Sequence, residues 1–262
     1  MKHIPRKRFG QNFLTDQLVL SQIIRAINPR SGDTMVEIGP GLAAMTSLLL
    51  EGVPQMHVVE LDRDLVTRLK KSFPADKLII HEGDALKFDF NTIPVPEGKK
   101  LRVVGNLPYN ISSPLLFHLA EIANQVEDQH FMLQKEVVER MVAPPGSKTY
   151  GRLSVMLQWR YEMDLLFVVP PESFDPPPKV DSAIVRMIPK KETLPCDQKS
   201  LEAVVTKAFS QRRKVVRNCV AGMFTEQQLI DAGVDPQARP ETIPLEQYVN
   251  LARILHTTAS LK

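Results

Sequence analysis

The chain has few cysteines and no long apolar segment. Its two cysteines, Cys196 and Cys219, form neither a C-x-x-C motif nor a zinc-binding spacing, so we expect no disulfide framework and no metal centre. No apolar run approaches the ~18 residues of a membrane-spanning helix, and no apolar region follows the basic residues 2–8 as it would in a signal peptide. These absences predict a cytoplasmic protein with reduced thiols.

Charge is nearly balanced overall but is unevenly placed. The 262 residues carry a net charge of only +3, and their 43% hydrophobic and 24% charged content is typical of a globular protein. Basic residues gather before the first acid and again near the C-terminus, at Lys2, Arg6, Lys7 and Arg8 and at Arg212, Arg213, Lys214 and Arg217. Each cluster either neutralises nucleic-acid phosphates or is a solvated surface, and the sequence alone leaves both interpretations open.

Strand-like and helix-like segments alternate in the first part of the chain. The predicted strands are 34–38, 56–60, 78–81, 101–104 and 130–134, and the predicted helices are 42–50, 62–72, 114–122 and 135–142. Ser112 or Ser113 is expected to be the N-cap of the third helix. This alternation with short connections indicates an α/β fold with a doubly wound, mostly parallel sheet. Two later strands, 165–169 and 183–188, are expected to form a hairpin at one edge.

A polar segment with two prolines, residues 189–199, is the candidate domain boundary. Beyond it only helical patterns occur, at 201–209, 215–223, 227–232 and 245–255. We therefore predict an α/β domain over residues 1–192 and a small all-α domain over residues 193–262.

A glycine-containing turn follows the first predicted sheet strand. Gly39, Gly41 and Ala44 fit the G-x-G-x-x-A fingerprint, which lets the backbone approach a nucleotide at the start of a helix. Glu60 ends the next strand, where a carboxylate can bind a ribose diol. NAD and S-adenosylmethionine both fit this pattern. Asp84, after the third strand, favours the methyl donor because a carboxylate there can accept an adenine N–H; it is also a common turn residue.

The end of the fourth predicted strand carries the most informative segment, Asn106-Leu107-Pro108-Tyr109. The Asn106 side-chain oxygen and a main-chain carbonyl at Leu107 or Pro108 could each accept one N–H of an exocyclic amine. Such a grip localises the nitrogen lone pair, and Tyr109 could stack on the base with roughly 1–3 kcal/mol. An ordinary strand-to-helix turn uses the same residue types and remains the alternative at this point.

With these features in place, the chain closely resembles the ribosomal RNA adenine N6,N6-dimethyltransferase family from about residue 6 to residue 256. It is most similar to the bacterial small-subunit (16S) branch that is linked to kasugamycin sensitivity. The motifs that carry the resemblance are KRFGQNFL at 7–14, VEIGPGL at 36–42, ELD at 60–62, GDA at 83–85, GNLPYNI at 105–111, QKEV at 134–137, PPPKVDS at 176–182 and FSQRRK at 209–214.

The resemblance implies a Rossmann-like class I methyltransferase sheet with helices on both faces over residues 1–192 and an RNA-binding helical domain over residues 193–262. It implies dimethylation, from S-adenosylmethionine and without a metal, of N6 in two adjacent adenosines of the 3′-terminal hairpin loop of 16S rRNA. The implied partner is the immature 30S subunit late in its biogenesis, and the implied state is a monomer.

The resemblance also assigns roles to individual residues. Those assigned to the cofactor, from its methionine end to its adenine, are Gln11, Asn12, Leu14, Gly39, Gly41, Asn106, Glu60, Asp84 and Ala85. Those assigned to the target base are Asn106, Leu107 and Tyr109, with Phe174 facing Tyr109 across a base flipped out of its stack. Those assigned to RNA contact are Arg212, Arg213 and Lys214.

One residue departs from the family pattern. Many members have glycine at the position of Ala43, and we expect the extra methyl group only to tighten helix packing slightly. Three alternatives stay open: an adenine methyltransferase for 23S rRNA or DNA, a mainly non-catalytic subunit-assembly factor, and, more distantly, an NAD oxidoreductase. Leu107 argues against the DNA enzymes, which more often carry proline there.

Overall fold

The computed structural model describes residues 4–5, 11–211 and 213–260, which form two compact units. The first unit comprises the described residues up to Val138 together with Met163–Pro189. The second comprises Glu139–Glu162 and the described residues from Lys190 onward.

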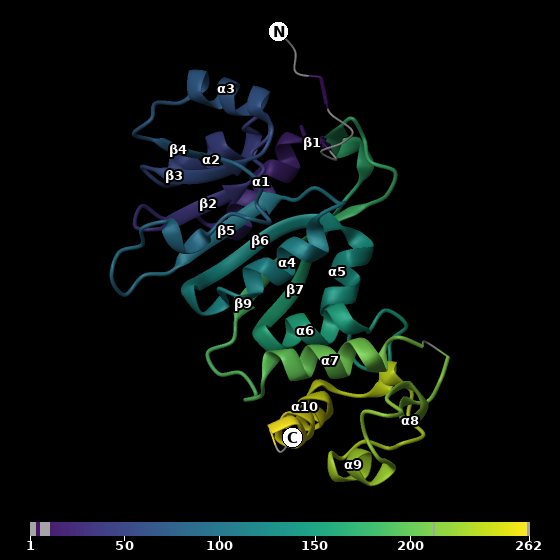
Figure 1. The fold of residues 1–262 in the computed structure, drawn as a ribbon. Coiled ribbons are helices and arrows are strands. Elements are labelled where there is room, and N and C mark those ends of the chain that lie inside the picture. The colour runs from purple at the N-terminus through teal and green to yellow at the C-terminus, as the bar shows by residue number, and fades with distance from the viewer. Residues whose placement is uncertain (1–3, 6–10, 212, 261–262) are drawn as a thin grey trace. The chain divides into compact units, whose positions relative to one another are not determined.

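The first unit is built on a seven-stranded sheet with the order β4-β3-β2-β5-β6-β9-β7 (Figure 1). The strands are β2 (Thr34–Ile38), β3 (Met56–Glu60), β4 (Leu78–Glu82), β5 (Leu101–Asn106), β6 (Val126–Gln134), β7 (Tyr161–Val169) and β9 (Ser182–Pro189). From β4 to β6 all neighbours pair in parallel, whereas β9 runs antiparallel to β6. The predicted α/β sheet is confirmed, and the two late strands lie side by side at its edge as expected.

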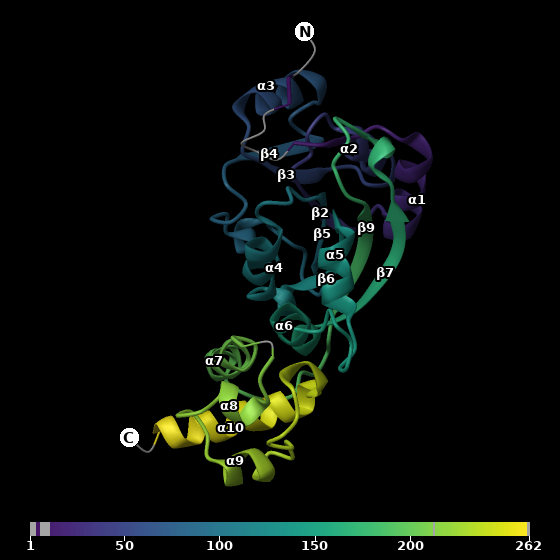
Figure 2. The same cartoon turned by 90° about the vertical axis from the view of Figure 1, so that its right-hand side faces the viewer.

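Helices cover both faces of this sheet. They are α1 (Gln17–Ile27), α2 (Ala44–Gly52), α3 (Arg63–Ser72), α4 (Ser112–Ala120) and α5 (Lys135–Val142). Figure 2 shows α1 and α4 on opposite sides of the strands. The first of these, absent from the predicted elements, begins where the Asp16 side chain accepts hydrogen bonds from the N–H groups of Leu18 and Val19. Its buried face packs into the main apolar core together with residues of β2 and β3.

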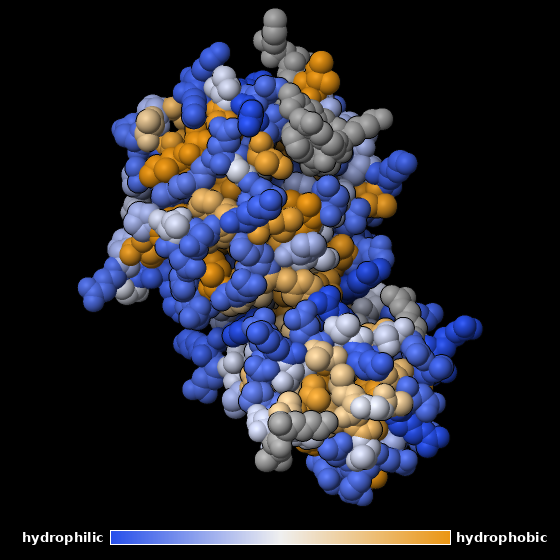
Figure 3. Space-filling model, viewed as in Figure 1, coloured by the Kyte–Doolittle hydropathy of each residue, from blue (hydrophilic) through white to orange (hydrophobic). Residues whose placement is uncertain are grey.

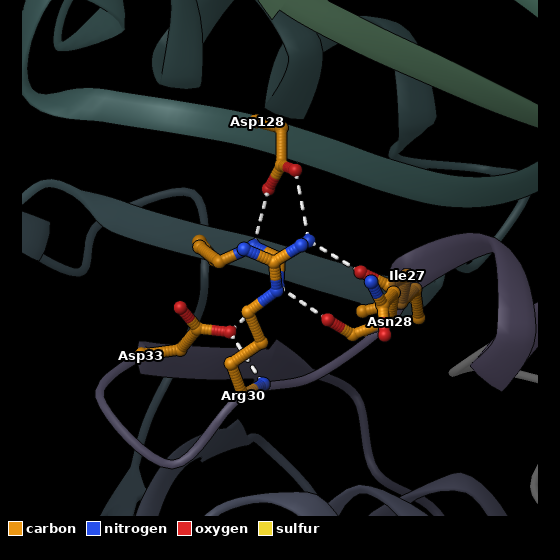
Figure 4. A network of polar contacts seen from close by, with 6 residues as sticks. Ile27, Asn28, Arg30, Asp33 and Asp128 are labelled. Carbon is orange, nitrogen blue, oxygen red and sulfur yellow. Dashed lines mark hydrogen bonds and ion pairs between the residues drawn. The ribbon is translucent and has the colours of Figure 1, made fainter.

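A buried ion network joins the amino ends of β5 and β6 to the end of α1 (Figure 4). The Arg102 guanidinium donates to both carboxylate oxygens of Asp128 at 2.9 Å and to Asp33 at 2.7 Å. It also donates to the carbonyl oxygens of Ile27 and Asn28. One cation therefore satisfies the last turn of a helix and two carboxylates at once.

The second unit is helical. It contains α6 (Arg152–Arg160), α7 (Gln198–Ala208), α8 (Val216–Cys219), α9 (Glu226–Asp231) and α10 (Leu245–Ser260), with α7 packed against both α6 and α10. Two buried tyrosines satisfy their hydroxyls on main-chain carbonyls: Tyr150 donates to Ile243 at 2.8 Å, and Tyr248 to Pro240 at 2.7 Å.

The division into units differs from the predicted boundary between residues 192 and 193. The C-terminal helices do form a unit of their own, but Glu139–Glu162 belongs to it, although the sequence placed this segment in the first domain. The reason is long-range packing. The Trp159 indole donates to the Leu194 carbonyl at 2.8 Å, and the Arg160 side chain donates to Gln198 at 2.9 Å.

Hydrophilic residues cover most of the face shown in Figure 3, with apolar patches between them. In the part of the chain that the structure describes, no helix is long and apolar enough to cross a membrane. Two exposed large apolar residues, Leu42 and Leu61, line the cavity described next.

Candidate active site

The carboxyl ends of β2, β3, β4 and β5 open onto one cavity of about 210 Å³ in the first unit. This is the edge at which parallel sheets place their ligands. The sequence-predicted residues that line the cavity are Gln11, Asn12, Leu14, Gly39, Gly41, Glu60, Asp84, Ala85, Asn106, Leu107 and Tyr109. The structure thus gathers four separate motifs and the N-terminal segment around a single space.

The turn between β2 and α2 forms one wall of the cavity and has left-handed backbone at Gly39, Gly41 and Ala43, with φ angles of 67°, 59° and 68°. A side chain at Gly41 would place its Cβ 3.0 Å from the Phe13 ring. The absence of a side chain at Gly41 therefore lets the segment 11–14 pack closely against this turn. The prediction for Ala43 was wrong. Its methyl group does not merely tighten packing, because the left-handed conformation costs a non-glycine residue about 1–2 kcal/mol.

Glu60 is fixed at the end of β3 by main-chain donors. Its carboxylate accepts from the N–H of Asp62 at 3.0 Å and of Gly41 at 3.3 Å. Burial raises the pKa of Glu60, while these two N–H groups lower it. Next along the sheet edge, one carboxylate oxygen of Asp84 accepts from the Leu86 N–H at 3.0 Å, so Asp84 holds its turn and also lines the cavity.

Glu37 is a cavity residue whose place just before the glycine turn favours S-adenosylmethionine in the sequence, although no site role was predicted for it. It is buried in β2 and accepts a 2.6 Å hydrogen bond from the Thr46 hydroxyl. Burial raises the pKa of Glu37 to about 7, the Thr46 hydrogen bond opposes the rise, and the charge of Glu60 adds to it. A cationic ligand in the cavity would keep this carboxylate ionised. The available signal was its place two residues before Gly39.

Residues 11–14 form a strap along the cavity. Gln11 donates to the Asp62 carboxylate at 2.8 Å, and the Asn12 carbonyl accepts from the Asn106 side chain at 3.0 Å. Strand β1 (Phe13–Leu14) then pairs with β8 (Phe174–Asp175) in antiparallel fashion. The strap is therefore held by α3, by β5 and by the segment that precedes β9.

The side chain of Asn106 is oriented by this strap. Because its amide nitrogen donates to Asn12, its amide oxygen is left as an acceptor. The Pro108 carbonyl accepts from the Ile111 N–H at 3.3 Å within the turn. That bond favours Leu107, rather than Pro108, as the second carbonyl for an amine.

The start of α4 differs from the prediction. The helix begins at Ser112, and Ile111 is its N-cap without a side-chain hydrogen bond, so neither Ser112 nor Ser113 has the predicted capping role. The Ser112 hydroxyl donates instead to the carbonyl of Tyr109 at 3.2 Å. The Tyr109 hydroxyl pairs with that of Ser182, the first residue of β9. This turn is therefore held by one local contact and by one contact, with Ser182, that only the folded sheet provides.

A family model described as ribosomal RNA adenine dimethylase matches residues 2–257. The chain belongs to this family. The resemblance read from the sequence motifs is thereby confirmed.

Relatives and solved structures agree with that assignment. The chain is 78% identical to a protein of Janthinobacterium sp. (strain Marseille) named "Ribosomal RNA small subunit methyltransferase A", over 97% of this chain and 100% of that protein. It is 57% identical to the protein of the same name in Laribacter hongkongensis, over 96% of each chain. The crystal structure of a dimethyladenosine transferase from Plasmodium falciparum has the same fold, with a TM-score of 0.78, 24% identity and coverage of 94% of this chain and 98% of the other. The 23S rRNA methyltransferase ErmE has a TM-score of 0.73 at 25% identity, over 94% of this chain and 100% of ErmE.

Two groups of predicted residues lie outside the cavity. Phe174 is only 3% exposed, belongs to the apolar core beside Leu14, and is not among the described residues that line the cavity. Its predicted contact with a base stays a prediction. Of the basic cluster, Arg213 and Lys214 lie in the second unit, and Arg212 lies outside the described residues. Among the described residues, no group of three or more histidine, cysteine or acidic side chains is placed to hold a metal ion.

Proposed function

We propose that this member of the ribosomal RNA adenine dimethylase family transfers two methyl groups to N6 of each of two adjacent adenosines in the 3′-terminal hairpin loop of 16S rRNA. The observation that carries this proposal is the position of Asn106–Tyr109, whose amine-gripping segment opens onto the same cavity as the glycine turn and Glu60. The names of the relatives at 57–78% identity support the small subunit as the source of the RNA.

The cavity fits S-adenosylmethionine, the methyl donor of this family. A backbone turn without side chains at Gly39 and Gly41 leaves room for the donor, and buried Glu60 offers carboxylate oxygens to its ribose hydroxyls. Asp84 and Ala85 stand where they can bind its adenine, and the strap of residues 11–14 covers its methionine end. When bound, the donor supplies an electrophilic methyl group on a sulfonium sulfur.

The residues of the chain activate the amine by positioning it. The side-chain oxygen of Asn106 and the carbonyl of Leu107 each accept one N–H of the adenine amine, which draws the nitrogen lone pair out of conjugation with the ring. With the donor bound, its methyl group would pass to this lone pair, and the electron pair of the broken carbon–sulfur bond would stay on sulfur. The nitrogen then loses a proton to water. Because that ammonium is strongly acidic, no side chain has to serve as a base.

The base is held from its faces as well as from its edge. Tyr109 stacks on one face of the flipped adenine, and Phe174 approaches the other, which requires the Phe174 ring to leave part of its present burial. Both roles rest on motif position and on the place of Tyr109 in the cavity wall.

The helical second unit provides the proposed contact with the ribosomal particle. Arg212, Arg213 and Lys214 bind rRNA phosphates of the immature 30S subunit, and the protein acts as a monomer in the cytoplasm, where that particle is assembled. Replacing Arg213 and Lys214 with alanine should weaken binding to 30S particles and flatten its dependence on salt, because each phosphate contact releases counterions. An unchanged salt slope would rule out phosphate contact at these positions.

Primer extension tests the function directly. The purified protein and S-adenosylmethionine are added, in separate reactions, to 30S particles and to 23S rRNA from a strain that lacks this modification. N6,N6-dimethyladenine cannot form a Watson–Crick pair, so reverse transcriptase should stop at two adjacent adenosines near the 3′ end of 16S rRNA. Stops on 23S rRNA, or tight 30S binding with no stop, would instead support the large-subunit or the non-catalytic alternative.

A further inference from the structure

Ser182 is a buried serine whose hydroxyl contacts Tyr109, a residue that lines the active-site cavity. It is fully buried at the first position of β9, opposite Gln134 in the antiparallel pairing with β6. Just beside it, the Lys135 N–H donates to the Asp181 carbonyl at 2.9 Å. The hydroxyl of Ser182 is hydrogen-bonded to the phenolic hydroxyl of Tyr109. Because Ser182 lies in a paired strand, its position is fixed. It therefore holds the hydroxyl end of the Tyr109 side chain in place.

Tyr109 is consequently held at its main chain and at its phenolic hydroxyl. Its main-chain carbonyl accepts from the Ser112 hydroxyl at 3.2 Å, and its phenol is bonded to Ser182. With these two points fixed, the direction of the ring axis is set before any base arrives, so less ordering is left for the moment of binding. Burial raises the pKa of Tyr109, which keeps the phenol neutral as a hydrogen-bonding partner for Ser182.

We propose that Ser182 is a positioning residue that fixes the Tyr109 ring and thereby determines whether an adenosine receives one methyl group or two. The proposal rests on the function proposed above, in which Tyr109 stacks on the target base. In this proposal the phenolic hydroxyl of Tyr109 is hydrogen-bonded to Ser182 and does not contact the substrate.

The amine offers fewer hydrogen bonds in the second transfer than in the first. An unmethylated amine offers two N–H groups, which the Asn106 oxygen and the Leu107 carbonyl accept. The first transfer forms one carbon–nitrogen bond, leaves the electron pair of the broken carbon–sulfur bond on sulfur, and releases one proton from nitrogen to water. The monomethylated amine has a single N–H, so one acceptor loses its partner. Stacking on Tyr109 must then supply a larger share of the positioning in the second transfer.

The test compares Ser182→Ala, Tyr109→Phe and the double variant on 30S particles that lack the modification. Nucleosides from the 16S rRNA are measured by mass spectrometry, and the ratio of monomethylated to dimethylated adenosine is compared at equal total methyl incorporation. That ratio does not depend on how much of each preparation is correctly folded. Ser154→Ala is the matched control, because Ser154 is also a fully buried serine and lies in the second unit.

Each single variant should raise the monomethylated share by about threefold to fivefold, as loss of one neutral hydrogen bond predicts, and the double variant should match the singles because both remove the same bond. Ser154→Ala should keep the wild-type ratio. A wild-type ratio for Ser182→Ala, or additive effects in the double variant, would overturn the proposal while leaving the function intact. Absence of dimethyladenosine from the wild-type reaction would instead overturn the function itself.

Discussion

Replacing Arg102 with methionine removes a cation that two aspartates and the end of a helix share. The Arg102 side chain is 8% exposed, and its bonds to Asp33 and Asp128 are 2.7 and 2.9 Å long. Burial alone lowers the pKa of the guanidinium, yet the hydrogen bonds and charges of Asp128 and Asp33 raise it above its ordinary value. The arginine is therefore charged throughout the range in which the protein is folded, and its loss leaves two carboxylates facing each other.

The size of the effect follows from the burial of the partners. Breaking a buried ion pair by removing one member costs about 3–5 kcal/mol, because a charge is left without compensation. The Asp33 and Asp128 side chains are 16% and 18% exposed, so water reaches them in part and the lower end applies. A loss of about 3 kcal/mol corresponds to a fall in Tm of roughly 6–12 °C for a chain of this size.

Differential scanning calorimetry of the purified protein would measure this shift. Arg102 lies in the first unit, so the transition that contains the sheet should move while a separate transition of the helical unit should not. Arg102→Lys keeps the charge but loses the bidentate fork, and it should lose less stability. Adding Asp128→Asn to Arg102→Met should recover part of the loss. A Tm for Arg102→Met within 2 °C of wild type would refute the account of this network.

Three further predictions concern the core, the base site and pH. Ala43→Gly should raise the free energy of unfolding by a net of about 0.5–1 kcal/mol, and the denaturant midpoint with it, because relief of about 1–2 kcal/mol of left-handed strain exceeds the cost of the larger unfolded-chain entropy of glycine. An unchanged or lower midpoint would argue against strain. Phe174→Leu should keep an apolar side chain in the core and lower Tm only slightly, yet slow methylation at saturating RNA; an unchanged kcat would make Phe174 a core residue alone. Burial, with the charge of nearby His81, lowers the pKa of His57 from 6.5 to about 4. The unfolded chain takes up this proton below about pH 6.5 and the folded chain only near pH 4, so the stabilisation is complete above 6.5 and is lost as pH falls toward 4. His57→Asn should flatten that part of the stability profile, and an unaltered profile would show that another group causes the acid sensitivity.

Much of the sheet could be predicted from the sequence because its strands are short apolar runs that end at glycine, acid or asparagine. Helix α6 could not, since it passes directly into β7 at Tyr161 without a turn residue that would mark the boundary. The membership of residues 139–162 in the helical unit depends on contacts such as Trp159 with Leu194. The sequence pattern around either residue does not predict such a long-range contact.

The candidate site, like the fold, could be predicted from the sequence only in part. Motifs at successive strand ends were expected to lie together because parallel strands end at one edge of a sheet, and the cavity unites them. The left-handed backbone at Ala43 could not be predicted from an alanine, whose propensity points elsewhere. The bond between Tyr109 and Ser182 exists only because β9 returns antiparallel beside β6. The sequence motifs thus identified the residues of the site, whereas the hydrogen-bond partners of those residues became known only from the fold.

The central claim is that the main role of Asn106 is to activate the amine and that its contact with the donor adds little to donor binding. The decisive measurement combines calorimetric binding of S-adenosylmethionine with single-turnover methylation of 30S particles for Asn106→Ala, with Asn91→Ala, an exposed amide outside the cavity, as control. The account predicts donor affinity within about tenfold of wild type and a methylation rate lower by on the order of 10²–10³, the usual cost of losing an essential preorganised dipole. A nearly normal rate with intact donor binding would contradict it.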